Sequence, residues 1–526
     1  ALFTIIIIYF IFSRNAIYFH ILYFMCNHFF LSYFIGGEIM GFMDVIDAMV
    51  AFVWGPPLII LLLGTGALIT IGSGFFQFAH FGWIMKSTFG SITKKNENGE
   101  GTISAWEAAS IAVGGAVGAG NISGVATALA AGGPGSVFWI WLIALIGMMT
   151  KCAEVSLALH YRTPDITGER YVGGPTYYMQ FGLGEEKHWG GAYKILAVIF
   201  AIGIFISFVF TMQNYSTAES VSSTFPALSM PLVSTIFAVL LTIVIAGGLK
   251  RVGDFASKVV PFMCILYMLF ALIIIIKHIG QLPHAFGLIF GHAFTATAAT
   301  GGFAGATLSV TVQKGIQRAL YSNEAGWGTS PMVHATSIVD HPVEQGMWGC
   351  FEVFVDTILV CSATALVNIV TGMWSSGLTS ATMTLTAFES EIGFVGRAVI
   401  ALSVFLFAFT TGTGWYTYYD TLIRHGFQHD TPLRRALLAV IKYGNALPGW
   451  ILVLLSTKYN VTAGAVWTVV DLGTGVPTFI NLIALILLSK RFFELMKDYK
   501  ARYMGIGEVD PDFYVWDEDK RKLAAK

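Results

Sequence analysis

Charged residues and cysteines are both scarce in this sequence. Asp, Glu, Lys and Arg make up 12% of the 526 residues and leave a net charge of -1, without the basic clusters of a nucleic-acid-binding protein. The five cysteines show neither CxxC nor metal-ligand spacing, and no Walker motif is present. The sequence therefore predicts no nucleic-acid partner, no cysteine-bound metal and no use of ATP.

Apolar residues take the place of the missing charges. They make up 55% of the chain, the mean hydropathy is +0.70, and many separate apolar runs are long enough to cross a bilayer. We therefore expect an all-α polytopic membrane protein that lies in the lipid bilayer of the cell (inner) membrane.

Residues 1–39 differ from the rest of the chain. They are rich in Ile, Phe and Tyr and contain no Val, Pro or Asp. The codons of Gly36-Gly37-Glu38-Ile39 can spell a purine-rich ribosome-binding sequence just before Met40, so we expect residues 1–39 to be a non-native extension. The alternatives are a genuine extra helix over residues 16–35 and a signal peptide, although no A-x-A-like cleavage site is present.

Eleven apolar spans follow Met40 and form one transmembrane domain of residues 40–503, with a charged tail at 504–526. The spans cover residues 57–76, 103–130, 136–161, 192–215, 231–249, 259–276, 296–337, 348–373, 396–422, 433–455 and 463–488. We expect the residues from Lys490 onward to form a short helix and coil.

Basic residues indicate the orientation of these spans. If eleven spans alternate, most Lys and Arg fall in the loops of one side, which is expected to be cytoplasmic. This predicts a cytoplasmic carboxyl terminus and, if translation starts at Met40, an amino terminus outside. The basic residues on that side are Lys86, Lys94, Lys95, Arg162, Arg170, Lys187, Lys250, Arg251, Lys258, Arg424, Arg434, Arg435, Lys490, Arg491, Lys497 and Arg502.

The second span contains the segment AVGGAVGAGNISG, from Ala112 to Gly124. Its glycines crowd into a stretch that is otherwise helical, and each weakens a helix by roughly 1 kcal/mol relative to alanine. A break in the hydrocarbon region is tolerated where the freed backbone groups line a cavity or hold a ligand. We therefore expect a binding site here; the alternative is that the glycines only allow close helix packing.

The spans group as one plus five plus five. An extra first helix at 57–76 precedes a first set over 103–276 and a second set over 296–488, which we expect to be interrupted between Gln313 and Gly328. Because five is an odd number, the two sets have opposite orientations and form an inverted 5+5 repeat. Paired discontinuous helices in inverted halves favour a secondary transporter with its site at the bilayer midplane.

The chemistry of a broken helix suits a carboxylate and a cation together. Free N–H groups at a helix start attract a carboxylate, and free carbonyls at a helix end suit Na⁺. Residues 118–121 are candidates for both functions. Thr410, Thr411 and Thr413, close to Trp415, are candidate hydroxyl ligands, unless their hydroxyls only bond to the helix backbone.

Other polar groups at membrane depth also need partners. The amides of Gln213 and Asn214 follow an aromatic span, where they either meet a small polar ligand or cap the helix. We expect Glu324 to neutralise one of the two cations Lys314 and Arg318, because an unpaired ion is costly in a membrane.

Buried acids leave further alternatives open. Glu154 and Asp356 either pair within the helix bundle or carry a coupling proton. Glu324 and His334 suggest an intramembrane enzyme, but their spacing of ten residues fits no metal-ligand motif such as HExxH.

Several motifs resemble known transporters. Residues 114–121 resemble the G-x-A-V-G-x-G-N of the neurotransmitter:sodium symporters, which have the leucine-transporter fold. The SNEAGWG of residues 322–328, with GNISGVATA at 120–128 and GGPG at 132–135, is more similar to the alanine or glycine:cation symporter family, the sodium:alanine symporters. This similarity runs from Met40 to about Tyr503.

The resemblance implies a symporter, and not an enzyme, that couples entry of Na⁺ to uptake of a small neutral amino acid, alanine or glycine, by alternating access. Coupling to H⁺, or transport of another solute, is the alternative. Trp327 departs from the smaller residue expected in many relatives and is expected to reshape the second break. The implied Na⁺ ligands are carbonyls of Gly114 and Val117 and hydroxyls of Thr410 and Thr411. The implied amino-acid site consists of Gly118, Ala119, Gly120, Asn121, Gln213, Thr411 and Trp415.

Overall fold

The computed structural model describes residues 42–92, 100–298, 300–301 and 303–524. The expected extension at residues 1–39, with Lys94 and Lys95 of the orientation argument, lies outside them. Within the described residues, strands are limited to four two-residue segments, so the expected all-helical class is confirmed. These strands are β1 (Ile103–Ser104), β2 (Thr163–Pro164), β3 (Tyr171–Val172) and β4 (Ser337–Ile338).

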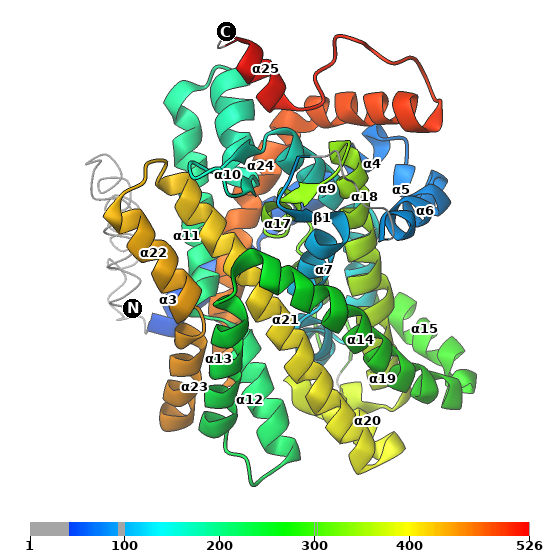
Figure 1. The fold of residues 1–526 in the computed structure, drawn as a ribbon. Helices are drawn as coiled ribbons and strands as arrows, with labels where there is room; N and C mark the ends of the chain where they lie inside the picture. The colour runs from blue at the N-terminus through cyan, green and yellow to red at the C-terminus, as the bar shows by residue number, and fades with distance from the viewer. Residues whose placement is uncertain (1–41, 93–99, 299, 302, 525–526) are drawn as a thin grey trace, which may run out of the picture.

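Helices account for nearly all of the regular structure (Figure 1). Up to the second broken segment they are α3 (Phe42–Val53), α4 (Pro56–Gly72), α5 (Phe76–Ala79), α6 (Phe81–Ile92), α7 (Ala105–Ala116), η1 (Gly120–Gly124), α8 (Val125–Gly132), α9 (Ser136–His160), α10 (Pro175–Tyr178), η2 (Met179–Glu186), η3 (Gly190–Ala192), α11 (Tyr193–Val209), α12 (Met212–Thr224), α13 (Met230–Ile245), α14 (Gly248–Lys277), η4 (Ile279–Gln281) and α15 (Leu282–His292). From there on they are α16 (Leu308–Asn323), α17 (Pro331–His334), α18 (Pro342–Val353), η5 (Phe354–Cys361), α19 (Ser362–Val370), η6 (Met373–Ser375), α20 (Ser380–Ile392), α21 (Phe394–Gly426), α22 (Pro432–Gly444), α23 (Leu447–Tyr459), α24 (Ala463–Met504) and α25 (Asp517–Ala524).

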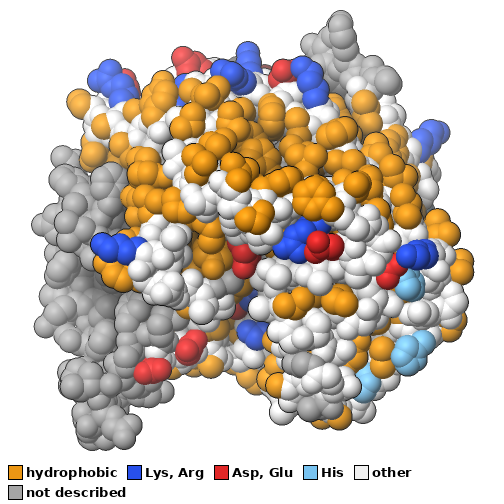
Figure 2. Space-filling view, turned by 90° about the horizontal axis from the view of Figure 1, so that it is seen from below, with side chains coloured by type: hydrophobic (Ala, Val, Ile, Leu, Met, Phe, Trp, Pro, Cys, Tyr) orange, Lys and Arg blue, Asp and Glu red, His pale blue; other side chains and the backbone are white. Residues whose placement is uncertain are grey.

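Many of these helices have the length and composition of membrane spans. Among the described residues, seven are long and apolar enough to cross a bilayer, or up to nine if each of two bent pairs is one span. Figure 2 shows hydrophobic side chains over much of one end of the molecule, with few charged ones between them. The chain is therefore a helical polytopic membrane protein, as its composition predicts.

The first predicted break is confirmed. α7 starts at a capping box in which the Ser104 hydroxyl accepts from the Glu107 N–H, and it ends at Ala116. η1 and α8 continue the chain after a bend of 40°. The glycine-rich segment thus interrupts the helix where its propensities predict.

The second break is shorter than predicted and lies later in the chain. Residues 313–323, expected within the break, belong to α16, and the irregular backbone covers residues 324–330. Three residues there have positive φ: Glu324 at 55°, Gly326 at 96° and Gly328 at 85°. The helix ends where this SNEAGWG backbone turns left-handed, a conformation that glycine adopts without cost.

Two further elements differ from the sequence prediction. The span expected at 192–215 is divided into α11 and α12, because Phe210 leaves the helix and Thr211 is extended and caps α12 with its hydroxyl. α24 continues to Met504, so the residues from Lys490 prolong a span before the short helix α25.

A short parallel pairing joins the two broken segments. β1, directly before α7, pairs with β4, which follows α17. α7 also packs against α17, and α8 against α16. The first helix of each broken segment thus lies beside the second helix of the other, so the two segments run antiparallel through the middle of the molecule. In Figure 1, α14 and α21 lie in front of them.

Candidate functional site

The first break is held closed by the side chain of Asn121. Its Oδ1 accepts from the Gly118 N–H at 2.8 Å. Its Nδ2 donates to Oδ1 of Asp356 on η5 at 2.6 Å and to the Asp356 carbonyl at 3.1 Å. Asn121 is fully buried, so these bonds fix the break against a neighbouring helix.

Asp356 connects the two breaks. Besides Asn121 of the first break, it accepts from the hydroxyl of Ser322, directly before the second break, at 2.7 Å. Thr357 donates to the same carboxylate oxygen. The Asp356 carboxylate is thus hydrogen-bonded within the bundle, and a coupling role for it stays a prediction.

α21 packs its threonines against the first break. Oγ1 of Thr411 lies 3.0 Å from the Gly114 carbonyl and 2.9 Å from the carbonyl of its own helix at 407, so its proton can go to either. Oγ1 of Thr410 lies 3.0 Å from the carbonyls of its own helix at 406 and 407. A Cβ added to Gly114 would lie 3.1 Å from Cβ of Thr410, and one added to Gly118 would lie 2.4 Å from Oγ1 of Thr411. The glycines thus allow α21 to approach the backbone of the break closely.

Gln213 reaches the break from a third helix. Its Oε1 accepts from the Ala119 N–H at 3.3 Å, and its Nε2 donates to the Tyr321 hydroxyl at 3.4 Å. The unpredicted division between α11 and α12 places Gln213 in the first turn of α12. Of the two alternatives for this amide, the structure favours a position at the first break over a helix cap.

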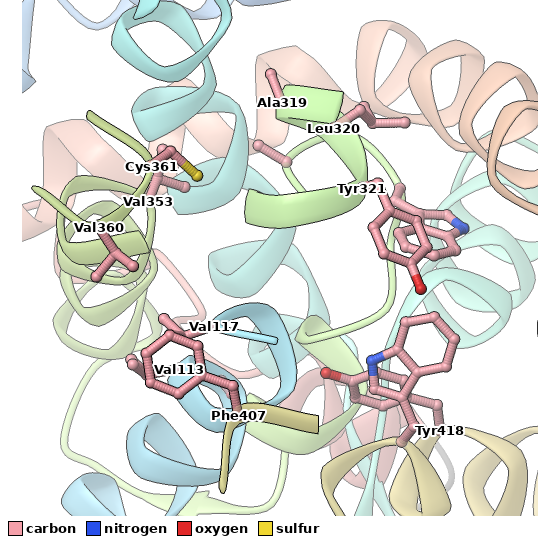
Figure 3. Packing of buried hydrophobic residues seen from close by; sticks show 14 of the residues in the cluster. Val113, Val117, Ala319, Leu320, Tyr321, Val353, Val360, Cys361, Phe407 and Tyr418 are labelled. Atoms are coloured by element: carbon pink, nitrogen blue, oxygen red, sulfur yellow. The ribbon is translucent and has the colours of Figure 1, made fainter. Parts of the chain in front are cut away.

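Trp415 lies between the two breaks and contacts residues of both. It is 5% exposed, and its Nε1 donates to Oε1 of Glu324 at 2.9 Å. The ring of Trp327 lies edge-on to it, with centroids 5.2 Å apart. Figure 3 shows buried apolar residues around this region, among them Val117, Phe407, Tyr321 and Tyr418.

The prediction that Glu324 pairs with Lys314 or Arg318 is wrong. Its carboxylate accepts from Trp415, Tyr418 and Thr329, whereas Arg318 pairs with Asp471 of α24 at 2.6 Å. Lys314 donates to the side-chain oxygen of Gln317 at 3.1 Å. The left-handed backbone at residue 324 ends the helix and turns the carboxylate toward α21, while the basic residues stay on the helix face toward α24.

Other buried charges support the second break. Oε2 of Glu154 accepts from the Gly326 N–H at 3.1 Å. Lys151 lies 3.3 Å from Glu352, which also contacts Nε2 of His334 at 3.1 Å. Lys151 and Glu352 were not predicted as functional residues, although a charge within an apolar span is the signal that identifies such residues.

Almost all predicted site residues therefore meet in one buried place. The first break is contacted by Thr411, Gln213 and Trp415, and Val117 is part of it. Thr410 is adjacent, but its hydroxyl is satisfied by helix carbonyls. An apolar groove of about 1110 Å³ lies between α11, α22 and α23 and contains no residue of the first break.

Comparison with known proteins decides the family. The profile of the Sodium:alanine symporter family matches residues 40–511. The chain belongs to this family.

The symporter is also similar to individual characterised and solved proteins. It is 35% identical to the sodium/alanine symporter AgcS of Methanococcus maripaludis, over 87% of this chain and 99% of that protein. It is 33% identical to the probable sodium/glutamine symporter GlnT of Bacillus subtilis, over 88% of this chain and 91% of the relative. Among solved structures, a manganese transporter from Eremococcus coleocola has a TM-score of 0.48 at 13% identity, covering 79% of this chain and 86% of that one.

Family membership makes the protein a sodium-coupled amino-acid symporter and not an enzyme. The alternative built on Glu324 and His334 is therefore wrong. In the structure these two residues have separate partners, and the described residues contain no group of three His, Cys, Asp or Glu that could hold a metal ion.

Proposed function

We propose that this symporter couples the entry of Na⁺ to the uptake of alanine or glycine. The observation that carries the proposal is the contact between Thr411 of α21 and the Gly114 carbonyl, 3.0 Å apart at the first break. It brings a hydroxyl and a free helix-end carbonyl together, two oxygen ligands of the kind that suit Na⁺.

In this proposal Na⁺ binds where α7 ends. The carbonyls of Gly114 and Val117 and the hydroxyls of Thr410 and Thr411 supply its ligands. When Na⁺ binds, the Thr411 hydroxyl turns its lone pairs to the ion and gives up its hydrogen bond to Gly114. The ion thereby replaces a hydrogen bond that now joins α21 to the break.

The amino acid binds on the other side of the same break. Its carboxylate meets the N–H groups of residues 118–120 at the start of the second half-helix. Gln213 now accepts from one of these groups, and Asn121 holds the loop in shape. Trp415, whose indole N–H is bonded to Glu324, limits the space for the substrate side chain. Trp327 packs edge-on against the Trp415 ring. This small space suits alanine or glycine.

We propose a leucine-transporter fold with eleven spans, one plus an inverted 5+5 repeat; the antiparallel broken segments support the inverted arrangement. The units are an extra first helix at 57–76, a first repeat at 103–276, a second at 296–488 and a cytoplasmic tail at 504–526. Transport follows by alternating access as the halves rock around the site. Because coupling is reciprocal, the amino acid tightens Na⁺ binding by the factor by which Na⁺ tightens amino-acid binding.

Uptake of labelled alanine into proteoliposomes tests this function. We expect uptake that requires an inward Na⁺ gradient and is lost in Asn121→Ala, because the break then loses both its internal bond and its bond to Asp356. Asn368→Ala is the matched control: this buried asparagine bonds to Thr364 and Thr384, away from both breaks.

The coupling ion is tested in the same vesicles. Uptake that is indifferent to Na⁺ but follows a pH gradient would contradict the proposal and favour an H⁺-coupled carrier. Equal loss in both variants would show that the effect of Asn121→Ala reports general destabilisation and not a role at the site.

A further inference from the structure

The chain after α24 turns back over one end of the helix bundle. α24 ends at Met504, where Gly505 is left-handed at φ 66°. The chain then leads to the short helix α25, which Figure 1 shows at the end of the molecule that also holds β1 and α10. The family profile ends at residue 511, so residues 512–524, here called the terminal segment, lie outside it.

Trp516 anchors the terminal segment to a hydrophobic cluster at the start of α7. This cluster is separate from the main core and joins the first turns of α7 to α9 and α18. Its buried members are Ala105, Ala109, Val155, Leu159, Val339 and Trp348. The terminal segment thus packs on the end of α7 that lies farthest from the first break.

Arg162 connects the terminal segment to both broken segments. Its guanidinium lies 4.2 Å from the ring centroid of Trp516 and 4.6 Å from that of Tyr171. It also donates to the Ser337 carbonyl of β4 at 2.7 Å and to the Glu100 carbonyl at 2.5 Å. Because β1 leads into α7 and β4 follows α17, Arg162 links the terminal segment to the chain beside each broken segment.

Two further contacts hold the terminal segment in place. The guanidinium of Arg521 on α25 lies 3.7 Å from the ring centroid of Phe181, and its Nη2 donates to the Arg162 carbonyl at 3.3 Å. The Val515 carbonyl lies 2.7 Å from Nδ1 of His160, the last residue of α9. Side chains of several elements therefore fix this segment, in addition to its covalent connection to α24.

These contacts bear on how α7 can move. The non-helical residues 117–119 and the 40° bend provide a hinge at one end of α7. At its other end, β1 pairs with β4 over only two residues. If the site opens on this side, that end of α7 must separate from its neighbours, as rocking of the halves requires. The separation would disrupt the cluster under Trp516 and the bonds of Arg162.

We propose that the terminal segment is a latch, which keeps the β1 and β4 end of the bundle closed and releases when the site opens there. In the proposed orientation this end is cytoplasmic. The inference rests on the proposed function, because the latch controls a transport step only if the halves rock around the first break. Loss of the latch should free α7 without removing a residue of the Na⁺ or amino-acid site.

Hydrogen–deuterium exchange of the full chain in detergent tests this restraint. In Trp516→Ala, exchange of the backbone N–H groups of residues 103–112 should rise about tenfold, while α20, at the opposite end of the molecule in Figure 1, exchanges as in the wild type. Arg521→Gln removes the contacts with Phe181 and the Arg162 carbonyl. It should raise exchange in the same residues by a smaller factor, and it serves if the Trp516 variant does not fold.

Tyr514→Ala is the matched control. Tyr514 lies two residues before Trp516 and is 44% exposed. Among the described residues it has no hydrogen-bond, ion-pair or ring partner. Its exchange at residues 103–112 should equal that of the wild type.

Na⁺-driven alanine uptake in proteoliposomes separates a latch from a segment that only stabilises the fold. Uptake should stay at or above the wild-type rate in Trp516→Ala and Arg521→Gln. Unchanged exchange at residues 103–112, a rise that is equal in α20, or loss of uptake in both variants would overturn the latch and leave the symporter proposal standing. Absence of Na⁺-dependent uptake in the wild type would overturn the proposed function, and with it the latch.

Discussion

Thr411 and Thr413, two residues apart on α21, differ in what their hydroxyls contact. Oγ1 of Thr411 lies 3.0 Å from the Gly114 carbonyl of the first break and 2.9 Å from the Phe407 carbonyl of its own helix, whereas Oγ1 of Thr413 bonds to the carbonyl of Thr410 in its own helix. Both are buried. Both hydroxyls bond back to their own helix, and Thr411 has the cross-helix contact in addition, which makes it the better candidate for an ion ligand.

This difference gives a prediction at the residue scale. Thr411→Val keeps the shape of the side chain but removes an oxygen from the proposed Na⁺ site. We expect the Na⁺ concentration for half-maximal alanine uptake to rise about tenfold or more, equivalent to about 1.4 kcal/mol. Thr413→Val should leave it near the wild-type value, and equal effects of the two variants would contradict the placement of Na⁺.

Gly118 supplies a second prediction at this scale. A Cβ at this position would lie 2.4 Å from Oγ1 of Thr411 and 3.4 Å from Oε1 of Gln213. Gly118→Ala should therefore push the break away from α21 and abolish alanine binding, measured as loss of alanine-dependent thermal stabilisation in detergent. Gly64→Ala, where a Cβ meets nothing within 4 Å, should bind alanine as the wild type does. Retained alanine binding in Gly118→Ala would show that the binding site does not require the close contact between α21 and the break at Gly118.

The sequence predicted helix breaks where glycine-rich segments weaken the helix. Crowded glycines located the first break, and the SNEAGWG motif marked the second. The boundary of the second was placed too early, because residues 313–323 are polar but form a regular amphipathic helix. The division between α11 and α12 was missed because Phe210 and Thr211 are neither glycine nor proline, although an extended Thr211 whose hydroxyl caps α12 is an ordinary start of a helix.

The hydrogen-bond and ion-pair partners that side chains find on other helices were less predictable than the helices themselves. Glu324 and Arg318 lie six residues apart, yet they bond to α21 and α24, about 90 and 150 residues along the chain. Local spacing suggested that they pair. Which way each side chain points depends on the left-handed backbone at residue 324, and sequence spacing does not report this.

An ion-pair network joins the loop between β2 and β3 to two helices. Asp165 of the loop lies 2.6 Å from both Arg424 of α21 and Arg434 of α22. Arg424 also pairs with Asp420, which is bonded to Arg170. The network holds this loop against the ends of the two helices.

The pH dependence of this network is a prediction at the element scale. Burial raises the pKa of Asp165, but Arg424 and Arg434 outweigh it and leave the pKa below its ordinary value. The stabilisation is thus fully present above the ordinary pKa of about 4 and is lost as pH falls through the lowered value. Asp165→Asn should lower the Tm at pH 6–8 by about 1 °C for each kcal/mol lost, and the difference should vanish only below about pH 4.

Asp254→Asn is the control for this measurement. Asp254 pairs with Lys258, but both side chains are more than half exposed, so the pair contributes little. A Tm difference for Asp165→Asn that is already lost near pH 6 would contradict the lowered pKa.

For the whole molecule, the antiparallel arrangement of the two broken segments explains why the sequence was informative about function. The two breaks lie in distant parts of the chain, and Asp356 bonds to Asn121 of the first and to Ser322 close to the second. Composition predicted the class and the motifs predicted the family. The apolar groove between α11, α22 and α23 was not predictable, because it forms where several helices meet.

The last prediction concerns the whole transport cycle. An amino-acid zwitterion carries no net charge, so each Na⁺ that accompanies it moves one positive charge into the cell. An inside-negative potential of 100 mV then contributes about 2.3 kcal/mol per Na⁺, or roughly 50-fold in accumulation. Proteoliposomes with a valinomycin-imposed potassium potential should therefore accumulate more alanine at equal Na⁺ on both sides. Li⁺ in place of Na⁺ and liposomes without protein are the controls. Accumulation that ignores the potential would mean that a second charge leaves in each cycle, and the simple Na⁺ and amino-acid symport proposed here would be wrong.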